Sequence, residues 1–255
     1  MPTAIAIAAH PDDIEFFMSG TLMRLAEVGY EIHYWNLANG CCGTSQYDCE
    51  TIARMRRQEG MDAAAAIGAV FHESICDDLG IFYDRPTLAK VASVMRGVNP
   101  QIVLTHSPVD YMEDHTNTCR LAVTAAFSRG MPNFAVDPPR PHVAGKVTVY
   151  HAQPYSNKTP LRELVIPELF VDVSALQDRK KTMLACHVSQ KVWLDESQGH
   201  NSYLVTMSEL DAEVGRLSGG KFAYAEGWRR HLHLGFCDPD DDPLRDALGK
   251  HAVQY

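Results

Sequence analysis

The feature that most constrains the fold is the apolar run from Thr3 to Ala9, near the start of the 255-residue chain. A strand with one face in water alternates apolar and polar side chains, whereas a strand covered on both faces is apolar throughout. Strands of the second kind occur mainly in parallel sheets, because the connecting helices cover both faces. The run therefore predicts a buried parallel strand.

Helix-like and strand-like segments alternate after this run. Ile14–Val28 carries apolar residues near helical spacing and stops at Gly29, and Thr51–Ile67 is an alanine-rich, charged helix that stops at Gly68. The alternation predicts an α/β fold with an open, mostly parallel sheet and helices on both faces. The other predicted segments are strands at Glu31–Ala38, Ala69–Ile75 and Gln101–Thr105 and helices at Leu88–Arg96 and Thr116–Arg129.

The pattern changes beyond Arg129. Four prolines between Met131 and Lys146 predict an irregular loop. The length suits one domain, in which residues 1–130 form a doubly wound core with the functional site and residues 131–255 form a smaller lobe that completes the pocket. Later segments are predicted as strands at Val147–His151 and Leu169–Val173, helices at Leu176–His187 and Ser208–Leu217, and a solvated acidic loop at Asp238–Pro243.

Composition and charge argue against several kinds of partner. The formal net charge of −9 disfavours binding to nucleic acid or to an anionic membrane surface. No apolar run is long enough to span a bilayer, and the N-terminus lacks the pattern of a secretory signal. The seven cysteines contain no Cys-x-x-Cys pair, and Cys41 and Cys42 are adjacent, so we expect reduced thiols in a cytoplasmic protein.

Two His/Asp clusters follow predicted strands. His10 to Asp13 come directly after the first strand, and Asp114-His115 follow the strand at Gln101–Thr105. Ligands of open parallel sheets bind beyond the carboxyl ends of the strands. Catalytic zinc takes three protein ligands and keeps one position for water, so His10, Asp13 and the second cluster predict such a site. Asp12 is not needed as a ligand and can serve as a general base.

The same residues are compatible with a simpler structure. A His-Pro-Asp-Asp run can form a turn in which an aspartate caps the following helix. A buried strand precedes the run, a helix follows it, and a second His/Asp cluster lies at another strand end. This context favours the metal site.

Several motifs resemble the PIG-L/LmbE-like superfamily, whose members include zinc-dependent de-N-acetylases of N-acetylglucosaminyl compounds. The most specific is Ala9-His10-Pro11-Asp12-Asp13-Ile14-Glu15, which resembles the signature Ala-His-Pro-Asp-Asp-x-Glu. The resemblance extends along most of the chain, and the weaker motifs occur in the expected order. They are Asn39-Gly40 with Gly43, Arg56-x-x-Glu59, Thr105-His106, Asp114-His115, His187-x-Ser189-Gln190 and Tyr224-Ala225-Glu226.

The resemblance implies a Rossmann-like, three-layer α/β/α fold and one zinc ion bound by His10, Asp13 and His115. It also implies that Asp12 is the general base for the attack of a metal-activated water on an amide carbonyl. The substrate would be a small molecule, a sugar derivative, and a homo-oligomer is expected from the resemblance.

One residue departs from the family pattern. The sugar deacetylases typically carry His-Pro-Asp-His where this chain has Met112-Glu113-Asp114-His115, and the first of those histidines helps to stabilise the intermediate or to protonate the leaving amine. Methionine can do neither. Asp114 is expected to orient His115 or a neighbouring group. The candidates for the missing function are His187, which lies in a family-like motif, His106, His200 and Tyr111.

Other residues are candidates for binding the substrate. Arg56 can clamp a hydroxyl, phosphate or carboxylate, or it can form an ion pair with Glu59 or Glu15. The other predicted substrate contacts are Asn39, His106 and Tyr111. The aromatic residues that could stack on a sugar, or instead lie in the core, are Trp193, Tyr203, Tyr224 and Trp228.

Three functions remain compatible with the sequence. The first is hydrolysis of an N-acyl group, expected to be acetyl, on an amino-sugar-like substrate. The second is a zinc-dependent hydratase or lyase acting on a small unsaturated carboxylate, which a basic pocket with Arg56, another cation and little room for a sugar would favour. The third is a non-catalytic metal-binding protein, which has no use for Asp12 as a base.

Overall fold

The structure, a computed structural model that describes residues 1–198 and 203–255, confirms the α/β fold. Its described strands form one eight-stranded sheet in the order β3-β2-β1-β4-β5-β7-β6-β8. The neighbours from β3 to β5 pair in parallel, whereas β7 and β8 each pair antiparallel to their neighbours. The strands are β1 Thr3–Ala8, β2 Glu31–Asn36, β3 Val70–His72, β4 Ile102–Thr105, β5 Thr148–Ala152, β6 Leu169–Asp172, β7 Ala225–Arg230 and β8 Ala252–Gln254.

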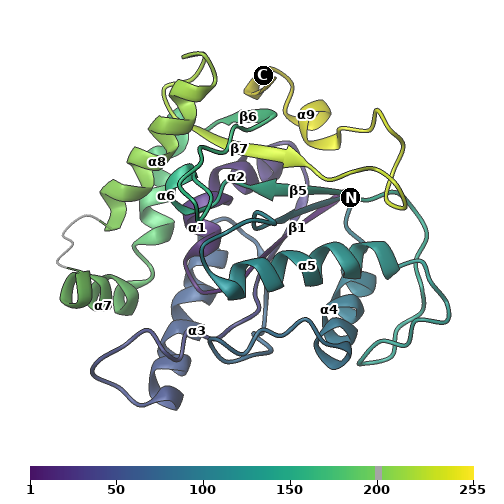
Figure 1. Ribbon diagram of the computed structural model, residues 1–255, viewed down its shortest axis with the longest axis horizontal. Coiled ribbons are helices and arrows are strands. Elements are labelled where there is room, and N and C mark those ends of the chain that lie inside the picture. Colours follow the sequence, from purple (N-terminus) through teal and green to yellow (C-terminus); the bar gives the residue numbers. More distant parts are fainter. Residues whose placement is uncertain (199–202) are drawn as a thin grey trace.

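Two layers of helices enclose the sheet. In β1, Ala4 and Ala6 belong to a core that includes side chains of α2, α3, α6 and α8, and Ile5 and Ile7 face the other core, formed with α4 and α5. Figure 1 shows α4 and α5 together, away from α6 and α8. The continuous apolar run therefore serves both faces, as a strand with period-two side chains must. The helices are α1 Asp13–Phe17, α2 Ser19–Glu27, α3 Cys49–Ala66, α4 Arg85–Val98, α5 Glu113–Ser128, α6 Gln177–Leu184, α7 Val188–Gln198, α8 Tyr203–Leu217 and α9 Pro243–Leu248, with 3₁₀ turns at Tyr155–Asn157, Ser174–Leu176 and Gly249–His251.

The helix predicted over Ile14–Val28 is instead two helices. The break falls at Met18, whose backbone φ of −137° is not helical and whose side chain cannot cap α2. Glu226 of β7 replaces the missing cap, because its carboxylate accepts the backbone N–H groups of Gly20 and Thr21 at 2.8 and 2.7 Å. A residue more than 200 positions away thus completes the N-terminus of α2.

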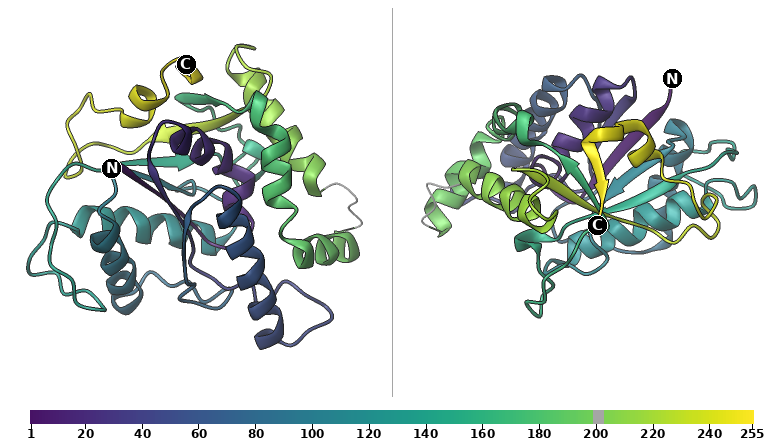
Figure 2. Two further views of the ribbon diagram at one scale, coloured as in Figure 1. Left: turned by 180° about the vertical axis from the view of Figure 1, so that it is seen from behind. Right: turned by 90° about the horizontal axis from the view of Figure 1, so that it is seen from above.

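The C-terminal segment contains elements that the sequence patterns did not predict. They include α7, β7, α9 and β8, and the last two lie at the β6–β7 end of the molecule, away from α3 (Figure 2). The acidic stretch predicted as a solvated loop is buried at its end, because Asp242 caps α9 and accepts a hydrogen bond from Tyr150 at 2.7 Å. Within the described ranges, no helix is both long and apolar enough to cross a membrane.

Candidate metal centre

The site lies where β1 and β4 end side by side. These strands pair in parallel at the point where the sheet order reverses direction, and in open α/β sheets the crevice outside such strand ends binds ligands. The residues from His10 to Asp13 follow β1 and lead into α1, and the residues from His106 to His115 follow β4 and lead into α5. The two His/Asp clusters of the sequence therefore meet.

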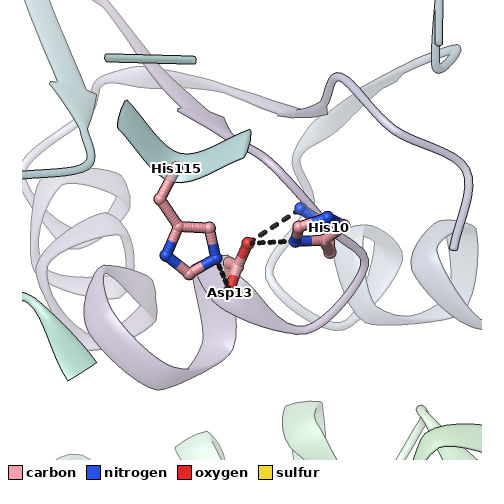
Figure 3. Close-up of side chains that lie close together, drawn as sticks. All are labelled: His10, Asp13 and His115. Carbon is pink, nitrogen blue, oxygen red and sulfur yellow. Dashed lines mark hydrogen bonds and ion pairs between the residues drawn. The ribbon is translucent and has the colours of Figure 1, made fainter. Parts of the chain in front are cut away.

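His10, Asp13 and His115 point toward one another, and their potential ligand atoms lie within 4.8 Å of each other (Figure 3). Asp13 occupies the middle: its Oδ2 is 3.4 Å from His10 Nδ1 and its Oδ1 is 3.4 Å from His115 Nε2. Two imidazoles and one carboxylate form a ligand set used by catalytic zinc sites, in which water takes the fourth position.

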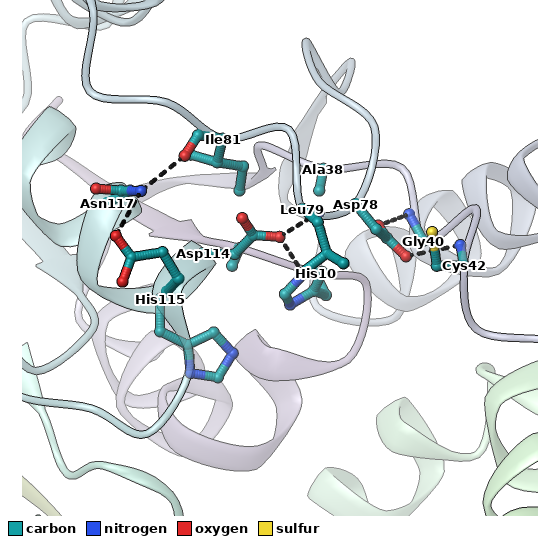
Figure 4. Close-up of polar contacts among 12 residues, drawn as sticks. His10, Ala38, Gly40, Cys42, Asp78, Leu79, Ile81, Asp114, His115 and Asn117 are labelled. Carbon is teal, nitrogen blue, oxygen red and sulfur yellow. Dashed lines mark hydrogen bonds and ion pairs between the residues drawn. The ribbon is translucent and has the colours of Figure 1, made fainter. Parts of the chain in front are cut away.

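Two further aspartates orient the histidines. Asp114 Oδ2 lies 3.0 Å from His10 Nε2 and also accepts the backbone N–H of Leu79 (Figure 4). Asp110 Oδ1 lies 3.0 Å from His115 Nδ1. With each carboxylate accepting the N–H of one ring nitrogen, a neutral imidazole would keep the lone pair of its other nitrogen toward Asp13, as in metal sites with a supporting carboxylate. Asp114 thus supports His10, and Asp110, which sequence reasoning missed, supports His115.

The charges of the site also fit a divalent cation. Burial alone would lower the pKa of both histidines, but hydrogen bonds to Asp114 and Asp13 raise the pKa of His10 to about 9. The charge of Asp13 and the hydrogen bond between His115 and Asp110 raise the pKa of His115 to about 10. Despite burial, the neighbouring histidines hold the pKa of Asp13 well below its usual range. The carboxylates therefore favour positive charge at this position, which a metal would supply in place of two protons.

Asp12 stands beside the ligand triad in a strained backbone conformation. Its φ is 115°, a region that non-glycine residues rarely adopt. Its Oδ2 accepts a 2.6 Å hydrogen bond from the hydroxyl of Tyr203, and its Oδ1 is 3.9 Å from Arg56 Nη2. Burial raises the pKa of this carboxyl to about 6, although the charge of Arg56 opposes the rise. A carboxyl with such a pKa can exchange a proton near neutral pH.

Arg56 links two loops under the cavity and is only 2% exposed. It donates to the carbonyl oxygens of Pro11 at 2.6 Å and Gly40 at 3.3 Å. Gly40 has φ +77°, and a Cβ there would lie 2.5 Å from Arg56 Cδ, so this loop needs a glycine. Glu59 accepts hydrogen bonds from Ser189 and Glu15 pairs with His187, so the structure does not support the alternative in which Arg56 forms an ion pair with Glu59 or Glu15.

A cavity of about 610 Å³ opens above the triad. Its lining includes Arg56 and Tyr111, which were predicted to bind the substrate, together with Asp12 and Met112. Residues from the second half of the chain form part of its wall, among them Tyr155, Gln190, Leu194, Tyr203 and Thr206. Phe16, Phe17, Tyr111, Tyr155 and Tyr203 give it an aromatic lining.

Besides Asp114, three predicted site residues do not line this cavity. His106 packs beneath His115 with stacked rings 4.1 Å apart, and its Nε2 accepts the backbone N–H of Ala9. His187 is fully buried, and its Nε2 lies 3.3 Å from Glu15 Oε2. Asn39 donates to Asp77. His200 lies outside the described residues.

Only part of the predicted aromatic surface faces the cavity. Trp228 is fully buried in the core, where its indole N–H donates to Thr21, and neither it nor Tyr224 is among the cavity residues. Tyr203 does line the cavity. The aromatic lining of the cavity is thus built on α1, on the segments around Tyr111 and Tyr155, and on Tyr203.

A family model matches the part of the chain that builds the site. Residues 5–126 match the model of the PIG-L family, described as GlcNAc-PI de-N-acetylase. This match to a PIG-L family domain over residues 5–126 confirms the resemblance predicted from the motifs. The match covers both strand ends that build the metal centre.

Relatives along most of the chain include two kinds of enzyme. The 4-oxalmesaconate hydratase of Pseudomonas putida is 27% identical over 236 residues, covering 88% of this chain and 87% of the relative. The diacetylchitobiose deacetylase of Thermococcus kodakarensis is 28% identical over 238 residues, covering 88% and 81%. The crystal structure of 4-carboxy-2-hydroxymuconate hydratase from Pseudomonas putida KT2440 has a TM-score of 0.73 at 26% identity, covering 90% of this chain and 96% of that chain. The reaction must therefore be inferred from the site.

Proposed function

We propose that this protein is a zinc-dependent hydrolase that removes an N-acyl group, expected to be acetyl, from an amino-sugar-like small molecule. The observation that carries the proposal is the separation of roles at the turn after β1. His10 and Asp13 converge with His115, whereas Asp12 faces the same cavity without joining that triad. A site that only bound metal would need no additional buried carboxylate held by Tyr203.

The size and charge of the cavity favour deacylation over hydration of a carboxylate. About 610 Å³ is ample for a sugar derivative, and small-molecule sites span roughly 300–1,000 Å³. Apart from the triad histidines, Arg56 is the one basic side chain among the described cavity residues, and it faces Asp12. Beyond the bound cation, a multiply charged carboxylate would have only Arg56 among the described cavity residues to offset its repulsion from Asp12, Asp13 and Asp78.

In the proposed reaction, zinc held by His10, Asp13 and His115 would polarise the acyl oxygen and make a neighbouring water more acidic. Asp12 accepts the proton of that water. The hydrogen bond from Tyr203 occupies Asp12 Oδ2, so Oδ1 is the oxygen left to take the proton. Tyr111, whose ring packs edge-on against His115, places a phenol beside the reacting centre to bind the substrate.

Met112 leaves the protonation of the leaving amine to another group, and we assign it to Asp12. With a pKa of about 6, this carboxyl can take a proton from water and return it to the amine within one turnover. His187 and His106 do not face the cavity, so Asp12 is better placed for this step than either histidine. The same carboxyl then acts as base and as acid.

The experiment is a screen of zinc-loaded protein against N-acetylated amino sugars, with released acetate measured. Asp12→Asn should keep its zinc and lose about 100-fold or more in kcat, because a general base contributes roughly 10²–10⁴. Asp240→Asn, at an exposed position, is the matched control. Near-normal turnover in Asp12→Asn would refute the assignment of the base.

The alternative is a zinc-dependent hydratase or lyase acting on a small unsaturated carboxylate. Two observations support keeping it: a hydratase is 27% identical to this chain over most of its length, and Met112 replaces the histidine expected of a sugar deacetylase. The second arm of the screen therefore follows hydration of unsaturated dicarboxylates by loss of their ultraviolet absorbance. Hydration without any acetate release would replace the deacylase proposal with this one.

A further inference from the structure

Three cysteines gather outside the candidate metal centre, where the loop after β2 leads into α3: Cys41 and Cys42 lie in the loop, and Cys49 is the first residue of α3. The Sγ atoms of Cys41 and Cys42 are 4.0 Å apart, and hydrogen bonding with Cys41 raises the pKa of Cys49 to about 11. All three thiols are free. Cys41 is the shared member of the cluster and is only 7% exposed, whereas Cys42 and Cys49 reach the surface.

Two carboxylates from the loop after β3 complete this cluster. The potential ligand atoms of Cys41, Cys49 and Asp77 lie within 4.8 Å of one another, and so do those of Cys41, Cys42 and Asp78. In a tetrahedral zinc site with metal–sulfur bonds of about 2.3 Å, neighbouring sulfur atoms are about 3.8 Å apart. Because Cys41 belongs to both groups, a cation bound at its thiolate would have donors of both groups nearby.

Hydrogen bonds to the two carboxylates already hold the two loops together. Asp78 accepts the backbone N–H groups of Gly40 at 2.7 Å and of Cys42 at 2.9 Å, as Figure 4 shows. Asn39 donates to Asp77 Oδ1 at 2.6 Å. Because these contacts fix the carboxylates beside the thiols, little chain ordering remains to be done on binding a cation.

We propose that Cys41, Cys42 and Cys49, with Asp77 as an oxygen ligand, form a second cation site that takes zinc or a softer thiophilic cation such as cadmium. Thiolate ligands select such cations over magnesium or calcium. Cys42 also lines the substrate cavity, and Arg56 donates to Gly40 in the same loop. A cation bound there would fix one wall of the cavity from outside the triad.

The test is a titration of the reduced full-length protein with Cd²⁺, followed by the ultraviolet charge-transfer absorption of thiolate bound to cadmium. Seven free thiols should be counted before the titration. We expect the band to saturate with one cation and to persist in His115→Ala, which lacks a ligand of the first site. Cys49→Ser, at an exposed position, and Cys41→Ser should each weaken binding at least tenfold.

Cys186→Ser and Cys237→Ser are the matched controls, because both remove a thiol elsewhere in the chain. They should leave the band unchanged. Circular dichroism of each variant separates loss of binding from loss of fold. The proposal is overturned if the reduced protein gives no band, if the band disappears in His115→Ala, or if the folded Cys49→Ser and Cys41→Ser variants bind as the wild type does.

Discussion

The hydroxyl of Tyr203 donates a 2.6 Å hydrogen bond to Asp12, joining the first residue of α8 to the turn after β1 across 191 positions of the chain. Both side chains are buried in the wall of the cavity. The contact fixes the orientation of the carboxylate that we assign as the base. Tyr203 is therefore a positioning residue.

Replacing Tyr203 with phenylalanine should lower kcat about 10- to 100-fold, the usual cost of losing a supporting partner of this kind. Removal of a hydrogen bond to the ionised carboxylate raises the pKa of Asp12, so the acidic limb of the pH–rate profile should move to higher pH. Tyr255→Phe, at an exposed position, is the control. A lower kcat with an unshifted profile would indicate a merely structural role.

Asp114→Asn should weaken zinc binding about 10- to 100-fold, because His10 would lose the carboxylate that holds its Nε2 proton. Competition with a chromogenic chelator measures this affinity. Glu113→Gln, one residue earlier and without contact to the triad histidines, is the control. Equal zinc affinities of wild type and Asp114→Asn would contradict the role given to this aspartate.

Glu226→Ala should destabilise the fold by about 3–5 kcal/mol, because it leaves Lys180 with one fewer partner in the core and uncaps α2. Lys180 is fully buried between Glu226 and Asp211, at 2.7 Å from each. Denaturant unfolding gives the free energy, and Glu209→Ala on the exposed side of α8 is the control. A change in the free energy of unfolding below 1 kcal/mol would argue against a stabilising role of the contacts among Lys180, Glu226 and Asp211.

His151 should make the protein acid-sensitive. Burial lowers its pKa to about 4, so below pH 6.5 the unfolded chain binds a proton that the folded chain does not. The contribution of the neutral His151 to the free energy of unfolding is fully present above pH 6.5. It is lost as the pH falls toward 4, by on the order of 3 kcal/mol. His151→Asn should flatten this dependence of the unfolding free energy, whereas His142→Asn, at an exposed position, should not. If the free energy of unfolding depends on pH equally in the wild type and in His151→Asn, the acid sensitivity does not come from His151.

The parallel core and the triad could be predicted because their signals are local. The apolar run of β1 stands next to His10 and Asp13, and His115 follows β4 in the same way. The supporting contacts carried no such signal. Asp110 is one aspartate among many in the sequence, and Tyr203 reaches Asp12 only through the packing of α8.

The elements missed by sequence reasoning have equally physical causes. The sequence of β7, Ala225–Arg230, contains a glycine, a glutamate and two arginines, so it has no strand-like alternation of apolar residues. Its glutamate is buried because it caps another helix and pairs with Lys180. Tertiary contacts decided the structure there, and single-sequence patterns do not contain them.

The assembly of the triad from two neighbouring strand ends would make metal binding a reporter of folding. His10 and Asp13 depend on β1, and His115 depends on β4, about a hundred residues later. High-affinity binding thus requires β4 to have docked beside β1, and an unfolded chain offers no such arrangement. Zinc would accordingly raise the melting temperature in proportion to the logarithm of its free concentration. During synthesis, the affinity would appear only after α5 has left the ribosome and packed against the sheet.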